Sequence, residues 1–273
     1  MRFPEGSLVS FFTSGFPSHV KVSAVDVGSY DREDFISFFR GIVLSVERFK
    51  VGRPNRYAET DHDYLVVVKS GSKLLKVLHV APYLEPGEEI KPGEALGKMI
   101  SSPYTGGDFR HAHIEGLRFT FPEIETSDER GIGQVVKTSE NFIDVRLSTY
   151  SIAGDFRGLG CCGGLLNASL PFAGYGGLIG TRQRGVIMVG GKKYSVARTR
   201  RNLSIFESRK GLVKNWEYDS AFKVMANRPV DGPPLLESIL SFRGRPVVRI
   251  FGKMDLKEGD EVDVWAIIGD HMG

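Results

Sequence analysis

The sequence predicts a mostly β protein, in which a β-sandwich or barrel is followed by a second β-rich domain. Runs of β-branched and aromatic residues recur between turn residues along the chain, a pattern typical of strands. The 33 glycines in 273 residues favour many tight turns. A polar, acidic stretch at residues 122–133 separates two such regions. We therefore expect one domain over residues 1–121 and another over residues 122–273.

The first domain contains five expected strands and one expected helix. A helix is predicted over residues 31–39, because acidic residues fill its first turn and Gly41 follows its end. The strands are predicted over residues 19–28, 41–51, 63–71, 73–84 and 111–121.

A double turn interrupts the first domain between two of its strands. Residues 84–97 contain the pairs Pro86-Gly87 and Pro92-Gly93, and each pair suits the two central positions of a type II turn. Such a segment reverses the chain twice within a few residues. It is typical of a β-sandwich or barrel in which a strand folds across its own end.

The second domain is expected to be β-rich, but its fold is not predicted. We expect a helix over residues 234–242 and a long ordered loop over the glycine-rich residues 154–180. Strands are predicted over residues 134–148, 185–191, 245–252 and 260–269.

A basic segment lies within the second domain. Residues 181–215 contain ten Lys or Arg residues and one acid, a net charge of +9 against +3 for the whole chain, which leaves about −6 elsewhere. Nucleic acid or another anionic polymer is a conceivable partner for such a segment. No zinc-finger, RNP or helix-turn-helix signature accompanies it, so we favour a solvated basic face that shapes access to a neighbouring site.

The sequence indicates neither a membrane partner nor an oxidising compartment. No apolar run approaches the roughly 18 residues of a membrane span. The start of the chain lacks the continuous apolar region of a signal peptide, because Pro4, Glu5 and Gly6 interrupt it. The only two cysteines, Cys161 and Cys162, are adjacent and cannot form an ordinary structural disulfide with each other. We therefore expect a cytoplasmic protein.

Three histidines and one aspartate of the first domain form a candidate metal centre. His111 and His113 alternate on one expected strand, so both rings point to the same face. His79 ends an apolar strand just before the double turn. Asp26 interrupts another apolar strand, where a buried carboxylate needs a cation or strong hydrogen-bond donors. Zn²⁺ would supply that cation.

The order of these residues resembles the lysostaphin-type zinc metallopeptidases. His19 comes first, then Asp26 in its apolar strand, a strand that begins with glycine at Gly41, and His79. The stretch PGEEIKPGEALG and a final H-x-H-x-E follow. The resemblance covers residues 15–118, somewhat under half of the chain. It implies a β-sandwich of the duplicated-hybrid-motif type and an activity of peptide-bond hydrolysis.

The resemblance implies one Zn²⁺ per chain, held by His19, Asp26 and His113, with His79 and His111 as catalytic residues. Two histidines and one carboxylate leave the fourth position of tetrahedral zinc open for water, as in catalytic sites. One catalytic histidine would take the proton of that water, and the other would stabilise the oxyanion. The sequence leaves open which does which. The implied substrates are glycine-rich or cell-wall-type peptides, cleaved by an endopeptidase or amidase.

The spacing of the first two ligands departs from the family pattern. His19 and Asp26 are seven residues apart, which is longer than usual in the family, and an odd spacing on one strand would place them on opposite faces. A turn or bulge at residues 21–23 must therefore return His19 to Asp26. His62 and His271 are the substitutes, although the sequence around His62 suggests a solvated loop.

Two further features near the H-x-H pair bear on its role. In the preceding loop Tyr104, Asp108 and Phe109 add bulk near the expected cleft, which indicates a different substrate preference. Glu115 matches the H-x-H-x-E ending of the family, although a local ion pair explains it equally well.

The alternatives to a peptidase are binding and carrier proteins. A non-catalytic metal-binding domain or a phosphocarrier-like sandwich, with the basic segment as an anion-binding module, is the main one. A lipoyl or biotinyl carrier needs a lysine at a hairpin tip, for which Lys98 is the nearest candidate. The oligomeric state is not predicted.

Overall fold

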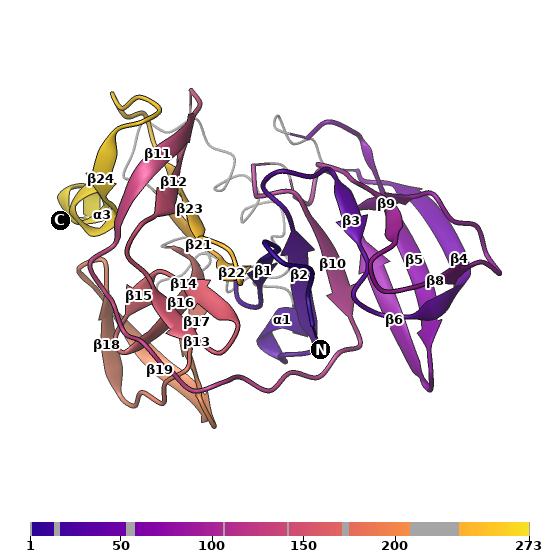
Figure 1. Ribbon diagram of the computed structural model, residues 1–273, viewed down its shortest axis with the longest axis horizontal. Coiled ribbons are helices and arrows are strands. Elements are labelled where there is room, and N and C mark those ends of the chain that lie inside the picture. The colour runs from indigo at the N-terminus through magenta and orange to yellow at the C-terminus, as the bar shows by residue number, and fades with distance from the viewer. Residues whose placement is uncertain are drawn as a thin grey trace. The chain divides into compact units, whose positions relative to one another are not determined.

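The chain divides into two compact units, both built mainly from antiparallel strands (Figure 1). One unit comprises Met1–Val9 and Pro17–Phe119, and the other comprises Ser10–Phe16 and Thr120–Gly273. The prediction of a mostly β protein is therefore confirmed. The computed structural model describes residues 2–13, 17–52, 58–105, 107–140, 142–170, 175–207 and 235–272.

The elements up to residue 119 are strands and one helical turn. In chain order they are β1 (Leu8–Ser10), α1 (Pro17–Val20), β2 (Ala24–Gly28), β3 (Asp34–Ile36), β4 (Gly41–Lys50), β5 (His62–Ser70), β6 (Lys73–Leu78), β7 (Val80–Pro82), β8 (Glu89–Ile90), β9 (Ala95–Met99) and β10 (His111–Glu115).

The remaining elements belong to the second unit. They are β11 (Ile132–Thr138), β12 (Phe142–Leu147), β13 (Ser151–Ala153), β14 (Phe156–Gly158), β15 (Gly160–Cys161), β16 (Gly164–Leu170), β17 (Tyr175–Ile179), β18 (Val186–Val189), β19 (Lys192–Arg200), β20 (Leu203–Glu207), β21 (Leu235–Ser238), β22 (Leu240–Phe242), β23 (Val247–Phe251), β24 (Glu261–Asp263) and α3 (Val264–Met272).

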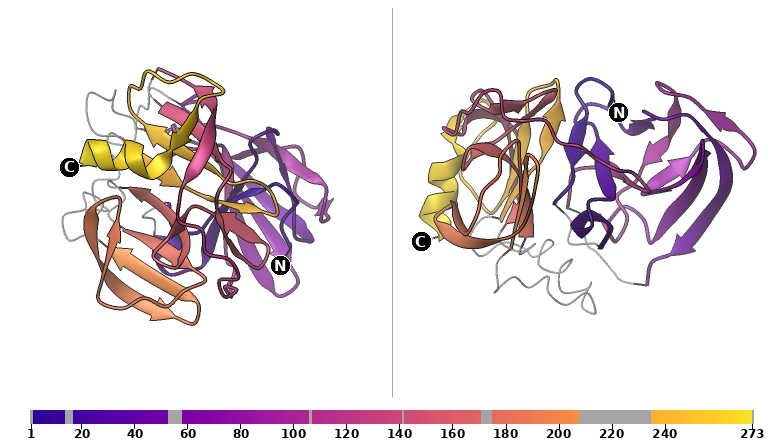
Figure 2. Two further views of the ribbon diagram at one scale, coloured as in Figure 1. Left: turned by 60° about the vertical axis from the view of Figure 1, so that its left-hand side comes forward. Right: turned by 90° about the horizontal axis from the view of Figure 1, so that it is seen from below.

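The first unit contains two antiparallel sheets. Strands β2, β10, β6, β5, β4 and β8 lie in that order in the larger sheet, which is seen from below in the right-hand view of Figure 2. Strands β3, β9 and β7 form the smaller sheet. Every residue of β2 is buried, since small and β-branched residues occupy most of its positions. This buried strand is the one that carries Asp26.

The double turn is present where the sequence predicts it. Gly87 and Gly93 have φ angles of +99° and +91°, in the left-handed region that the third residue of a type II turn requires. The amide of Gly87 donates to the Val43 carbonyl over 2.8 Å, and the amide of Gly93 donates to the Ser37 carbonyl over the same distance. The two turns therefore anchor the segment to the first unit's strands.

The helix predicted over residues 31–39 is wrong. Asp34–Ile36 forms β3, and Phe35 pairs with Gly97 of β9. The ring of Phe35 is 2% exposed and packs against Phe38 and Phe39, with ring centroids 6.3 Å away in both cases. Burial of this aromatic cluster therefore outweighs the helix signal from the acidic residues before it.

Gly28, the last residue of β2, permits close packing against β10. A Cβ atom there would collide with the backbone carbonyl of Arg110. We expect Gly28→Ala to lower the free energy of unfolding by about 1–3 kcal/mol, because β2 must move away from the Arg110 carbonyl to admit the added methyl group. Gly52→Ala is the control, since nothing lies within 4 Å of its added atom. Equal urea midpoints for the two variants would contradict this prediction.

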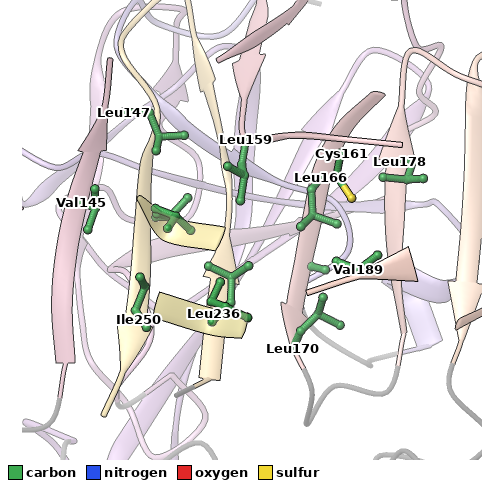
Figure 3. Close-up of a cluster of buried hydrophobic side chains, with 14 of the residues drawn as sticks. Val145, Leu147, Leu159, Cys161, Leu166, Leu170, Leu178, Val189, Leu236 and Ile250 are labelled. Atoms are coloured by element: carbon green, nitrogen blue, oxygen red, sulfur yellow. The ribbon is translucent and has the colours of Figure 1, made fainter. Parts of the chain in front are cut away.

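The second unit is organised around one long sheet. Its strands follow the order β18, β19, β20, β17, β16, β21, β23, β12, β11 and β24, and β15 pairs with β16. Figure 3 shows side chains from several of these strands in one apolar cluster, among them Val145, Leu166, Leu236 and Ile250. These four side chains are 0–2% exposed. The sheet therefore supports a core of its own.

The loop predicted over the glycine-rich residues 154–180 is wrong. Its described residues include strands β14, β15, β16 and β17. The glycines replace side chains where neighbours approach closely: a Cβ atom on Gly177 would enter the Phe12 ring, and one on Gly176 would collide with Ala168 and Phe206. The glycine content thus reflects dense packing in a sheet instead of loop freedom.

Two further predictions for the second unit need correction. The helix expected over residues 234–242 is replaced by β21 and β22, while Pro234 lies outside the described residues. The strand expected over residues 260–269 ends at Asp263, whose Oδ1 accepts from the amides of Trp265 and Ala266 over 2.8 and 3.3 Å and caps helix α3. Among the residues that the structure describes, no helix is long and apolar enough to cross a membrane.

Candidate metal centre

Three side chains from α1, β2 and β10 converge in the first unit. His113 lies directly opposite Asp26 in the antiparallel pairing of β10 with β2, so both side chains project from the same face. His19 comes from α1, and the turn expected after it is present. The amide of Val22 donates to the His19 carbonyl over 2.8 Å, and Val22 has a φ of +60°. This turn brings His19 Nε2 to 3.2 Å from Asp26 Oδ1.

The spacing of these three donor atoms suits one small cation. His113 Nδ1 lies 2.8 Å from Asp26 Oδ1 and 3.1 Å from His19 Nε2. Bonds of about 2.0–2.1 Å around tetrahedral zinc place its ligand atoms about 3.3 Å apart. The described residues also contain no other group of three or more His, Cys, Asp or Glu residues with this convergence. The donor set and its spacing therefore fit zinc.

The Asp26 carboxyl stays ionised although it is only 5% exposed. Burial alone raises its pKa, but His19, His111 and His113 outweigh that effect and hold the pKa well below its usual range. Three imidazoles thus surround one buried anion. This arrangement supplies the negative charge that a cation site requires.

The far side of the His113 ring is held by a second carboxylate. His113 Nε2 lies 3.3 Å from Glu115 Oε1 and 3.4 Å from Ser18 Oγ. Burial lowers the pKa of His113, but the bonds to Asp26 and Glu115 outweigh it and raise the pKa to about 9. The His113 contact in turn lowers the pKa of Glu115 to about 2. Glu115 therefore makes the local ion pair and also orients a candidate ligand.

The raised pKa of His113 predicts a pH-dependent zinc affinity. A protonated His113 must lose a proton before Nδ1 can coordinate a metal. We expect the apparent affinity to rise about tenfold per pH unit up to about pH 9, where His113 is neutral without metal, and then to level off. Competition with a chromophoric chelator measures this. Glu115→Gln should reach the plateau at lower pH, and a flat profile would exclude coordination by His113.

His79 and His111 lie beside the three donors. Their ring centroids are 5.5 Å apart, and the ring of His79 lies 6.0 Å from that of His113. His111 Nε2 is 3.9 Å from Asp26 Oδ1. Burial lowers the pKa of His111 to about 4, so this ring is neutral at physiological pH. The structure thus brings all five candidate residues into one cluster.

Asp63 belongs to the same cluster, although the sequence around His62 suggests a solvated loop. It is fully buried near the start of β5, and its Oδ2 lies 2.6 Å from His79 Nδ1. One sequence signal existed: β5 and β6 pair from Ser70 with Lys73 to Leu65 with Leu78, so Asp63 lies just beyond the end of β6 and beside His79. That register follows from the short turn between two predicted strands.

The substitutes for His19 and the carrier lysine are placed elsewhere. His62 Nδ1 contacts Asp61 Oδ1 over 3.2 Å and the guanidinium of Arg48 over 3.1 Å, away from the three donors. The side chain of His271 lies outside the described residues. Lys98 lies within β9, with its Nζ 2.7 Å from Glu33 Oε2, and not at a hairpin tip.

The loop before β10 contributes to the surroundings of the two candidate catalytic histidines, His79 and His111. The ring of Tyr104 lies 6.4 Å from the ring of His79. Phe109 is buried, and its carbonyl oxygen lies 2.6 Å from His111 Nδ1. Asp108 is partly exposed. Tyr104 and Phe109 therefore lie beside candidate catalytic histidines, and their effect on substrate preference stays a prediction.

Seven of the ten basic residues of the 181–215 segment lie on or beside strands β18, β19 and β20, which appear in orange in the left view of Figure 2. Six of these seven side chains are exposed, and Val186 and Met188 on β18 are exposed beside them. Arg209, Lys210 and Lys214 lie outside the described residues. A solvated basic face agrees with this exposure, and contact with an anionic polymer stays an unfavoured prediction.

Comparison with known proteins supplies one match. A family model described as "Domain of unknown function (DUF8155) N-terminal domain" matches residues 4–135, a segment that includes the candidate metal centre and Asp63. No curated protein and no solved structure matches the chain. The matched description names no activity, so the chemistry rests on the geometry of the site.

Proposed function

We propose that the first unit is a mononuclear zinc peptidase domain. The observation that carries this proposal is the convergence of His19, Asp26 and His113 on one point, with His79 and His111 beside them. Two histidines and a carboxylate are the ligand set of catalytic zinc sites, which keep one position for water. The resemblance of the same five residues to lysostaphin-type metallopeptidases supports the proposal. It also favours a duplicated-hybrid-motif sandwich for this unit.

The five residues divide into zinc ligands and residues for proton transfer and oxyanion stabilisation. Zinc, when bound by His19, Asp26 and His113, supplies Lewis acidity and lowers the pKa of water toward neutrality. His79 and His111 are not among the three converging donors, so their rings serve to accept a proton and to hydrogen-bond a developing oxyanion. Glu115 orients His113 through its outer nitrogen. The site therefore has the groups needed for amide hydrolysis.

Peptides are the proposed substrates, and the resemblance favours glycine-rich or cell-wall-type sequences. A fluorescence-quenched pentaglycine peptide is a suitable first probe. The 273-residue chain should contain one zinc per molecule by elemental analysis and should cleave this peptide. Treatment with 1,10-phenanthroline should abolish cleavage, and added Zn²⁺ should restore it.

The same experiment separates the peptidase from the main alternative. Stoichiometric zinc without cleavage of pentaglycine or of cell-wall-type stem peptides would favour a non-catalytic metal-binding domain. Absence of stoichiometric metal after reconstitution with Zn²⁺ would contradict both proposals.

A further inference from the structure

Asp63 holds His79 at two places. Its Oδ2 lies 2.6 Å from His79 Nδ1, and its Oδ1 accepts from the backbone amide of His79 over 3.0 Å. Oδ1 also accepts from the amide of Tyr64 over 2.7 Å, and the side chain of Ser102 donates to the same carboxylate. Burial raises the pKa of Asp63, but these contacts outweigh it and lower the pKa. The buried carboxylate is therefore ionised and surrounded by donors.

The contacts of Asp63 select one tautomer of His79. An ionised carboxylate only accepts hydrogen bonds, so the hydrogen of neutral His79 lies on Nδ1 and the lone pair lies on Nε2. The backbone of His79 has a φ of +66°, which costs free energy in a residue other than glycine. The bond from its amide to Asp63 offsets part of that cost. One carboxylate thus sets both the backbone and the ring of His79.

His111 has a different partner at the equivalent nitrogen. Its Nδ1 lies 2.6 Å from the carbonyl oxygen of Phe109, which selects the same tautomer but carries no full charge. A second proton on either ring creates an imidazolium. The Nδ1–H of His79 points directly at a buried carboxylate, whereas the Nδ1–H of His111 faces a neutral dipole and only its Nε2 lies 3.9 Å from the carboxylate of Asp26. The two candidate catalytic residues are therefore electrostatically distinct.

We propose that Asp63 is a positioning residue that fixes the Nδ1–H tautomer of His79 and stabilises its protonated form. His79, not His111, is then the base of the reaction. The proton of the attacking water passes to His79 Nε2 as the water oxygen bonds to the peptide carbon, and it passes on to the amide nitrogen as the C–N bond breaks. His111 contacts the reacting groups without carrying the proton. This assignment rests on the proposed peptidase function, whereas the tautomer does not.

The tautomer is measured directly by two-bond ¹H–¹⁵N correlation spectra of the zinc-loaded full chain, with the His79 signals identified by their loss in His79→Gln. Wild type should show hydrogen on Nδ1 of His79. In Asp63→Asn the side-chain amide can face the ring, so we expect hydrogen on Nε2 and unchanged zinc content. Asp61→Asn is the matched control, since that carboxylate is 67% exposed, and it should leave the His79 signals as in wild type.

Hydrolysis of the pentaglycine peptide supplies a second readout. Asp63→Asn should lower kcat by about 10²–10⁴-fold with little change in KM, as expected when the carboxylate of an Asp–His pair is lost. Asp63→Glu should recover part of the activity.

The outcomes separate this inference from the proposed function. A wild-type His79 with hydrogen on Nε2, or an Asp63→Asn variant with unchanged kcat, would overturn the inference alone. The wild-type spectrum decides the tautomer even if Asp63→Asn does not fold. A correct tautomer in a chain that binds no zinc or cleaves no peptide would instead refute the proposed function.

Discussion

Asp26→Ala and His113→Ala should each leave far less than one zinc per chain after purification and dialysis. Each change removes one of three donor atoms that lie 2.8–3.2 Å from one another. Loss of a residue that merely orients a ligand costs about 10–100-fold in metal affinity, so loss of a ligand should cost at least about 100-fold. Elemental analysis and competition with a chromophoric chelator measure the stoichiometry and the affinity.

The control for these ligand variants is His62→Ala. Its side chain lies outside the cluster and is 19% exposed, so its removal should leave one zinc per chain. Glu115→Gln should fall between these cases, because it removes only a contact to the outer nitrogen of His113. Retention of stoichiometric zinc by both Asp26→Ala and His113→Ala would show that the metal, if any, binds elsewhere.

His111→Ala should retain its zinc and lose peptide hydrolysis by about 10²-fold or more. His111 is not among the three converging donors, so its loss leaves the metal site complete. Its Nε2 lies 3.9 Å from Asp26 Oδ1, close enough to contact a group that reacts at the centre. Removal of one acid–base or oxyanion-stabilising group typically costs about 10²–10⁴-fold. The measurement is kcat/KM on pentaglycine, with zinc content determined on the same sample.

His79→Ala should likewise retain its zinc and lose peptide hydrolysis. Metal loss in the His111 variant would identify His111 as a ligand, because the 3.9 Å distance to Asp26 leaves that alternative open. Full activity in either variant would remove that residue from the mechanism. The effect should be absent in His62→Ala, which retains all five candidate ligands and catalytic residues.

Local sequence patterns determined the strand-rich architecture and marked four of the five candidate residues, whereas His19 was added only by the resemblance to a known family. Alternation placed His111 and His113 on one face of a strand, and a carboxylate in an apolar strand marked Asp26 as a buried charge in need of partners. The two Pro-Gly pairs predicted their turns for a similar reason, since φ is restricted by the residue types themselves. Patterns of this kind depend on few neighbours in the chain, so they are visible without a tertiary structure.

Tertiary structure alone decided the features that depend on distant contacts. The glycines of β16 and β17 resemble loop residues in sequence, yet their lack of side chains admits Phe12 and Thr181 from other parts of the chain. Residues 34–36 form a strand because Phe35 is buried in an aromatic cluster beside β9. The contact of Asp63 with His79 was also missed in the sequence, because the two residues are 16 positions apart and only the register of β5 with β6 brings them together. Burial then makes that contact strong, since a charge removed from water depends on the few groups that surround it.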